Sequence, residues 1–95
     1  MRVVILIQMD TIRQLRKLPR SMPEKIMEIL KKGIKIRFHY QHLIAKEEVV
    51  NLLEILRKNV EEANAILKKV SYPELGIRYI ERSGRIVIFF KVLLR

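Results

Sequence analysis

The sequence predicts an α+β fold: a two-layer α/β domain with a four-stranded mixed sheet and the element order β-α(α)-β-α-β-β. Three observations lead to this prediction. Short apolar or alternating runs, typical of strands, are separated by segments in which apolar residues recur at helical spacing. One helical segment, residues 45–70, is far longer than the others. The chain has 95 residues, of which 49% are hydrophobic, so residues 1–95 are expected to form a single domain with one core.

One strand and two helices are expected before residue 34. VVILIQM (3–9) is a continuous apolar run, typical of a strand that is buried on both faces. Residues 11–18 have their apolar positions on one side and predict a short helix that Pro19 ends. Residues 21–24, Ser-Met-Pro-Glu, form a capping-box pattern with proline in the first turn. The second helix that follows is expected to stop at the basic turn and glycine of residues 31–33.

Residues 34–40 predict a second, half-buried strand, because apolar and polar side chains alternate there. The positions expected to face the core are Ile34, Ile36, Phe38 and Tyr40, and those expected to face solvent are Lys35, Arg37 and His39.

The long helix 45–70 carries apolar residues at seven-residue intervals, in a stripe wide enough to cover a sheet or another helix. Asn59 is the one polar residue in this stripe. We place it at the flank, with a role in register or in an oligomer contact as the alternative. Residues 76–82 and 85–94 then predict two strands joined by a tight turn at Ser83-Gly84.

This order predicts two crossover connections between parallel neighbouring strands, and one antiparallel strand added by the hairpin. If the helices lie on one face of the sheet, the other face would display Lys35, Arg37, His39 and parts of the hairpin. Two-layer domains often bury such a face between two copies, so a homodimer is expected.

The net charge of +10 is unevenly distributed. Residues 1–46 carry eleven Lys and Arg against three acids, whereas residues 47–95 carry nine against seven. One-sided clusters of cations are the expected footprint of a polyanion site, in which arginine binds phosphate oxygens in a bidentate manner. The residues that we expect to contact nucleic acid are Arg13, Arg16, Lys17, Arg20, Lys31, Lys32, Lys35 and Arg37. The surface lacks recurrent exposed aromatics, which favours DNA or folded RNA held by its backbone over a stacked single strand.

The composition and motifs argue against several kinds of catalytic and metal site. Cysteine is absent, which excludes disulfides, thiolate metal sites and cysteine nucleophiles. The two histidines, His39 and His42, lack a third ligand and would point to opposite faces of a strand, so no metal is expected. The sequence has neither a glycine-rich phosphate loop nor a serine-hydrolase motif. We therefore expect no catalytic residue, no cofactor and no small-molecule substrate.

Two further features bear on location and source. Apolar runs fall short of the roughly 18–20 residues of a membrane helix, and the first of them is too short for a signal peptide, so we expect a cytoplasmic protein without a membrane partner. Fourteen isoleucines, twenty Lys and Arg and three each of Asn, Gln and Gly are typical of a hyperthermophile.

HLIAKEEVVNLLEILRKN (42–59) resembles the strand-to-helix segment of the Alba family of small archaeal DNA- and RNA-binding proteins. The length, the basic charge and the element order are also similar to that family, although residues 1–22 depart from its pattern. The resemblance implies a homodimer that lays a basic surface on nucleic acid, with the terminal hairpin as an arm. It carries over no catalytic residue.

TIRQLRKLPRSMPEKIMEIL (11–30) resembles the helical hairpin of the RelE/ParE toxin family. GIRYIERSGRIVIFFKVLLR (76–95) is similar to the closing pair of strands in that family. This second resemblance implies a metal-independent mRNA endoribonuclease or a gyrase poison, with Arg78, Arg85 and Tyr79 as site residues.

We therefore expect a small basic protein that binds DNA or RNA without enzymatic turnover, a homodimer from a hyperthermophilic archaeon or its virus or plasmid. One alternative is a RelE/ParE-like endoribonuclease. The other is a protein-interaction module, such as a viral inhibitor or a ribosome-associated subunit, that docks through the long helix or the final strand.

Overall fold

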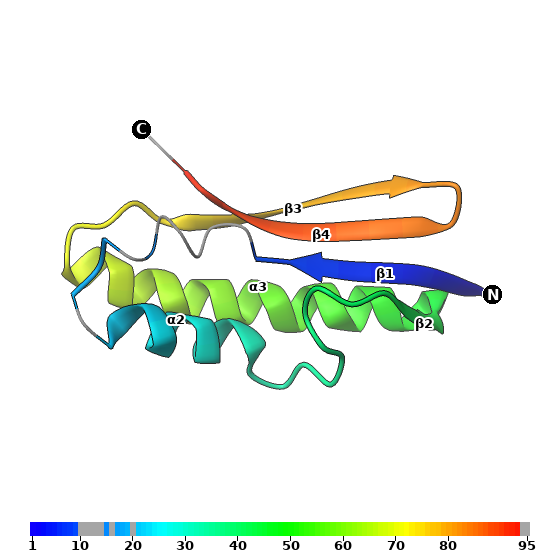
Figure 1. Ribbon diagram of the computed structural model, residues 1–95, viewed down its shortest axis with the longest axis horizontal. Helices are drawn as coiled ribbons and strands as arrows, with labels where there is room; N and C mark the ends of the chain where they lie inside the picture. Colours follow the sequence, from blue (N-terminus) through cyan, green and yellow to red (C-terminus); the bar gives the residue numbers. More distant parts are fainter. Residues whose placement is uncertain (10–14, 16, 20, 94–95) are drawn as a thin grey trace.

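A computed structural model describes residues 1–9, 15, 17–19 and 21–93 of the chain. The four strands form one mixed sheet in the order β2-β1-β4-β3, in which β1 and β4 are parallel and the other two neighbouring pairs are antiparallel. The elements, shown in Figure 1, are β1 (Arg2–Gln8), α2 (Met22–Lys31), β2 (His42–Ala45), α3 (Lys46–Lys69), β3 (Leu75–Arg82) and β4 (Arg85–Val92). This arrangement confirms the predicted α+β class and the four-stranded mixed sheet. The short helix predicted over 11–18 falls mostly outside the described residues.

The long helix and the hairpin form close to where the sequence predicts them. α3 has acidic residues in its first turn and lysines in its last, as the helix dipole favours. β3 and β4 are joined by Ser83 and Gly84, whose φ angles of 53° and 75° are the left-handed pair of a type I′ turn. Among the described residues no helix is apolar over enough length to cross a membrane.

The predicted strand over 34–40 is wrong, because the second strand of the sheet is β2 and residues 34–40 form an irregular segment before it. Three of the four apolar residues in this segment still pack against the core, but Tyr40 is 55% exposed. His39 has a φ of 70°, far from strand conformation, and its N–H donates to the carbonyl oxygen of Ile7 at 2.7 Å. The period-two pattern therefore comes from a loop laid along the core, not from a hydrogen-bonded ladder.

The predicted parallel crossovers are also wrong. β2 pairs with β1 in antiparallel orientation, with Arg2 opposite Ala45 and Ile5 opposite His42. In Figure 1, both α2 and β2 run in the direction opposite to β1, which makes β2 antiparallel to β1. The chain reverses its direction where β2 leads into α3. α3 then leads to β3, which lies at the opposite edge of the sheet from β2. The parallel pair of the sheet is instead β1 with β4.

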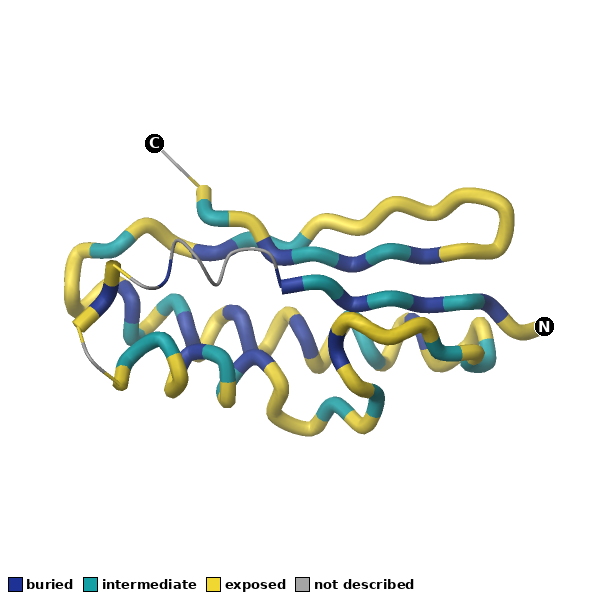
Figure 2. Tube along the Cα trace, viewed as in Figure 1, coloured by how far each residue is buried: buried dark blue, intermediate teal, exposed yellow. Residues whose placement is uncertain are grey.

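The helices cover one face of the sheet. Both helices lie along the same side of the strands in Figure 1. Alternate residues of β1 and β4 are buried against them and those between are not, as Figure 2 shows by colour. The buried set on these two strands is Val3, Ile5, Ile7, Ile86, Ile88 and Phe90. The prediction that the first strand is buried on both faces is therefore wrong.

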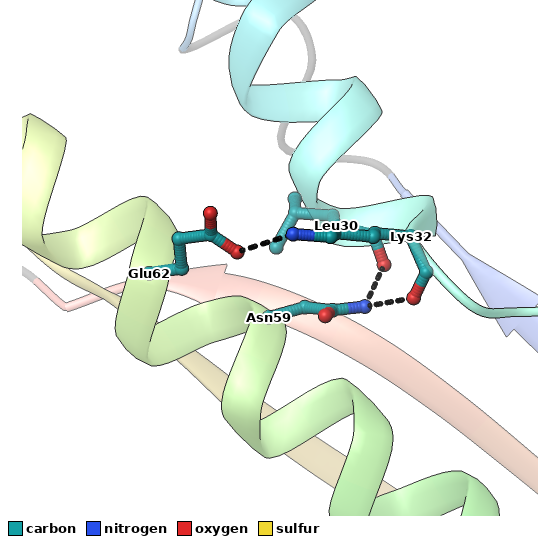
Figure 3. Close-up of polar contacts among 4 residues, drawn as sticks. All are labelled: Leu30, Lys32, Asn59 and Glu62. Atoms are coloured by element: carbon teal, nitrogen blue, oxygen red, sulfur yellow. Dashed lines mark hydrogen bonds and ion pairs between the residues drawn. The ribbon is translucent and has the colours of Figure 1, made fainter.

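Asn59 is buried in the interface between α2 and α3, not at the flank of the helix stripe where we expect it. Its exposed fraction is 5%. Its Nδ2 donates to the carbonyl oxygens of Leu30 and Lys32, at 3.0 and 2.8 Å (Figure 3). These carbonyls belong to the end of α2, where the helix leaves its last acceptors without intrahelical donors. One side chain of α3 therefore caps α2 and ties the two helices together.

Replacing Asn59 with alanine should lower the free energy of unfolding by about 1–3 kcal/mol, because two carbonyl groups in a buried interface lose their donor. Asn59→Asp should cost more at neutral pH, since a carboxylate accepts hydrogen bonds and cannot donate to carbonyl oxygens. Urea unfolding followed by circular dichroism measures both effects.

Asn51, an exposed asparagine on the same helix, supplies the matched control. Asn51→Ala should change the free energy of unfolding by less than about 0.5 kcal/mol. An Asn59→Ala protein as stable as this control would contradict the capping role.

Candidate nucleic-acid interface

The sheet face opposite the helices, here called the open face, is defined by the strand register. Side chains two apart on a strand, and those directly opposite on a neighbouring strand, point to the same side. Leu6 lies opposite Val87, and Val87 lies opposite Ile80, so these three share the open face. Each member of the face is intermediate or exposed. The full set is Arg2, Val4, Leu6, Gln8, Leu43, Ala45, Gly76, Arg78, Ile80, Arg82, Arg85, Val87, Phe89 and Lys91.

The centre of the open face is apolar. Leu6, Val87 and Ile80 form a row across three strands, and Phe89 follows Val87 on the same side of β4. Ile80 is 57% exposed, and none of these four side chains belongs to the described residues that pack against the core. Contiguous patches of exposed apolar side chains are uncommon on protein surfaces and often mark a binding site.

Five cations surround this apolar centre: Arg2, Arg78, Arg82, Arg85 and Lys91. The described residues of the open face include no aspartate or glutamate. None of the five cations makes an ion pair within the part of the chain that the structure describes. The face therefore combines apolar area with positive charge that none of the described carboxylates neutralises.

Two of these arginines are held side by side. Arg82 lies directly opposite Arg85 where the hairpin closes, and both side chains point to the open face. Like charges in directly opposite positions destabilise a pair of strands. They also raise the positive potential at that end of the sheet, which favours an anion there.

A hollow at the turn end of the open face is lined by Ile80, Arg82, Ser83, Arg85 and Val87. The two guanidinium groups can each hold an oxyanion with two parallel hydrogen bonds. The isoleucine and the valine give the hollow an apolar wall. This combination suits an anionic group attached to a planar or apolar one.

The structure describes five of the eight predicted contact residues. Lys17, Lys31, Lys32, Lys35 and Arg37 are all exposed. Lys31 ends α2 and the last three follow within six residues, so four of the five gather at the end of α2 and in the segment after it. The remaining three, Arg13, Arg16 and Arg20, lie outside the described residues.

Three members of this cluster already have partners. The Nζ of Lys31 lies 5.7 Å from the ring centroid of Phe38, and the guanidinium of Arg37 lies 4.8 Å from that of Tyr40. Both distances are within the range of cation–π attraction. The Nζ of Lys32 lies 3.7 Å from a carboxylate oxygen of Glu62 (Figure 3). These contacts orient the cations and reduce their availability, in contrast to the cations of the open face.

The two histidines have separate surroundings. The Nε2 of His42 lies 3.2 Å from both the backbone nitrogen and the carbonyl oxygen of Arg37, which ties the start of β2 to the preceding segment. His39 is exposed. The described residues contain no group of three or more His, Asp or Glu side chains that could hold a metal ion.

A second hollow lies where α3 leads into β3, and residues of both charges line it, among them Glu61, Lys68 and Glu74. Burial raises the pKa of the Tyr72 phenol in this hollow above its ordinary value. The mixed charge gives the hollow no preference for an anion.

The residues implied by the toxin resemblance do not converge. Arg78 and Arg85 belong to the open face. The side chain of Tyr79 points to the other side of the sheet, because neighbouring residues on a strand alternate.

Arg2, Arg82 and Lys91 are contact candidates that sequence reasoning missed. For Arg82 and Lys91 the signal was the alternation in β3 and β4, which places cations and apolar residues together at every second position. The prediction that one face displays parts of the hairpin is confirmed. Lys35 and Arg37, expected beside them, lie on the irregular segment and not in the sheet.

Comparisons of the chain with protein families, with curated proteins and with solved structures found no match. The resemblances to the Alba and RelE/ParE families therefore stay predictions from the sequence.

Replacing Arg82 with glutamine should raise the free energy of unfolding by about 0.2–1 kcal/mol at low salt, because it removes a like-charge pair across the hairpin. The gain should disappear at high salt, where the repulsion is screened. Urea unfolding at two salt concentrations measures both effects. Lys35→Gln, at an exposed position in the irregular segment, should leave the stability unchanged. A gain at Arg82 that persists in high salt would rule out repulsion as its cause.

Proposed function

We propose that the chain binds nucleic acid without turning it over, and that phosphate groups contact the cations of the open face. One observation carries this proposal. The open face has five cations and no carboxylate among its described residues, arranged around an apolar centre. A net charge of +10 adds long-range attraction for a polyanion.

The arrangement of the cations supports a polyanion over a single small anion. Arg82 and Arg85 sit at the closed end of the hairpin, whereas Arg78 and Lys91 lie further along β3 and β4. One small anion can engage one of these positions. A chain of phosphates can engage several at once, and each contact releases counterions from the nucleic acid.

The apolar centre supports unpaired bases as part of the ligand, which differs from the duplex or folded RNA that the sequence suggests. A duplex presents phosphates and sugars on its outside and would leave Phe89, Val87 and Ile80 without apolar partners. Unpaired bases can lie flat on an aromatic ring or on aliphatic side chains of a sheet. Phe89 lies directly opposite Arg78, so a base and its phosphate would find both groups next to each other.

The cluster at the end of α2 is a second, flanking contact in this proposal. Lys35 is its exposed member with no contact among those described above, and Arg37 is held over Tyr40. These cations lie on the irregular segment beside β2, so they would extend a ligand path away from the hairpin. Variants in the two places separate their contributions.

An acidic protein segment is the alternative ligand, because the apolar centre would also accept aliphatic or aromatic side chains. Such a segment would need alternating apolar and acidic residues to match the face. Nucleic acid and an acidic protein are distinguished by whether the purified chain carries absorbance at 260 nm that is lost after nuclease treatment and repurification.

The chain should bind a single-stranded oligonucleotide more tightly than a duplex of the same length, and its affinity should fall steeply with salt. The expected slope is about 0.7–0.9 log unit per log unit of salt for each phosphate contacted. Arg82→Gln combined with Arg85→Gln should reduce the slope by about two such contacts. Fluorescence anisotropy at four salt concentrations measures affinity and slope together.

Two further variants complete this experiment. Lys58→Gln removes an exposed cation from α3 and should leave the slope unchanged. Lys35→Gln combined with Arg37→Gln tests the flanking cluster. A slope that drops for the flanking pair and not for the hairpin pair would move the site away from the open face. Binding that ignores salt, or no binding at low salt, would overturn the proposal.

A further inference from the structure

We propose that a second copy of this chain pairs with the free edge of β3, so that two four-stranded sheets join into one eight-stranded sheet. This inference goes beyond nucleic-acid binding and stands on the backbone geometry of β3 alone. β3 lies at one edge of the sheet and spans eight residues, Leu75–Arg82. Its register with β4 is continuous from Leu75 to Arg82, so no bulge interrupts the edge. An edge of this length presents a row of peptide groups ready to pair with another strand.

The hydrogen bonds around β3 show which of its peptide groups point away from β4. The N–H of Leu93 donates to the carbonyl oxygen of Glu74 at 2.9 Å, so the peptide groups of Glu74 point toward β4. Backbone direction alternates along a strand, so the N–H and carbonyl groups of residues 76, 78, 80 and 82 also point toward β4. The N–H and carbonyl groups of residues 75, 77, 79 and 81 therefore point away from β4. The backbone N–H and carbonyl of Leu75 confirm this direction, because both bond to the side chain of Asn64, at 2.7 and 3.0 Å.

Asn64 thus forms hydrogen bonds with the first outward-pointing residue of the edge, Leu75, and leaves the next three such residues available for pairing. Its amide donates and accepts as a peptide group of a neighbouring strand would. Ile77, Tyr79 and Glu81 have no such partner among the described residues. The open part of the edge is therefore centred on Tyr79, which is 52% exposed.

Three outward residues with Tyr79 at the middle are complementary to themselves. In an antiparallel pair centred on Tyr79, the tyrosines of two copies face each other and Ile77 of each copy faces Glu81 of the other. All three outward residues of each copy then exchange backbone hydrogen bonds.

The two neighbouring registers of this antiparallel pair are less favourable. Centring the pair one residue earlier brings Glu81 opposite Leu75, whose peptide groups Asn64 already occupies. Centring it one residue later places Arg78 opposite Arg82 of the other copy, which sets like charges against each other. With Tyr79 at the centre, Arg78 meets Ile80 instead.

Charge argues against pairing through the open face. Two copies stacked face to face would bring ten cations together, with no carboxylate among the described residues of either face, at an apolar interface that excludes water. Edge pairing avoids this, because a two-fold axis perpendicular to the sheet keeps both open faces on the same side. The other free edge is the weaker candidate, since β2 has four residues and leads directly into α3.

The first experiment is sedimentation velocity over a range of protein concentrations in about 0.5 M sodium chloride, where repulsion between chains of charge +10 is screened. We expect a concentration-dependent shift from the mass of one chain to twice that mass. Tyr79→Pro should abolish the shift, because proline removes the outward N–H at the centre while the pairing with β4 is kept. Tyr79→Ala keeps that N–H and should still form the dimer.

The second experiment locates the contact and does not depend on a proline. The chain has no cysteine, so Tyr79→Cys introduces a single thiol at the two-fold axis. A short bifunctional thiol reagent should link two such chains. Tyr40→Cys is the matched control, because Tyr40 is an exposed tyrosine of similar exposure beside the opposite edge. It should give at least tenfold less linked dimer.

These results decide the inference separately from nucleic-acid binding, since neither experiment contains nucleic acid. A chain that stays monomeric at every concentration would overturn it. So would cross-linking as efficient through Tyr40→Cys as through Tyr79→Cys, or a folded Tyr79→Pro protein that still dimerises.

Discussion

One layer of helices covers one face of a four-stranded sheet, and the surface chemistry of the molecule depends on that constraint. α2 and α3 bury alternate residues of β1 and β4 and leave the residues between them outside the core. The same alternation that builds the core therefore also selects the open face. The arginines of the hairpin point to the same side because they occupy alternate positions on paired strands.

The pair of helices is itself held by a polar contact. Asn59 of α3 donates to two carbonyl groups at the end of α2. These are the acceptors that most helices leave to solvent or to a glycine turn. With the end of α2 anchored, the irregular segment after it starts from a defined point. It packs three of its four apolar residues against the core, and the N–H of His39 donates to the carbonyl oxygen of Ile7 in β1. The short strand β2 depends on this path.

The elements with long, local signals could be predicted from the sequence. α3 has a wide apolar stripe and charges that complement its dipole, and the hairpin has a two-residue turn with glycine, so both form within about two residues of their predicted bounds. The segment 34–40 could not, because alternating burial does not distinguish a strand from a loop lying on a core. The pairing of the strands could not be predicted either, because nothing in the sequence of β1 or β2 specifies which strand lies beside it or in which direction. Three cations of the open face, Arg2, Arg82 and Lys91, were missed for the same reason. The cations of this face are dispersed in the sequence, and only the register brings Arg82, Arg85 and Arg78 to one side.

The parallel pairing of β1 with β4 places a demand on the order of folding. Almost the whole described chain separates Val4 from Arg85, its partner in the ladder. Among the described strands β1 is made before β4, so the edge of β1 that pairs with β4 stays unpaired until β4 has been made. Pairings of such high sequence separation are slow, because the loop between them must close before any contact compensates its entropy. Until β4 has been made, β1 presents an unpaired apolar edge, and unpaired strand edges favour aggregation. The sheet is complete only when the hairpin brings β4 against β1.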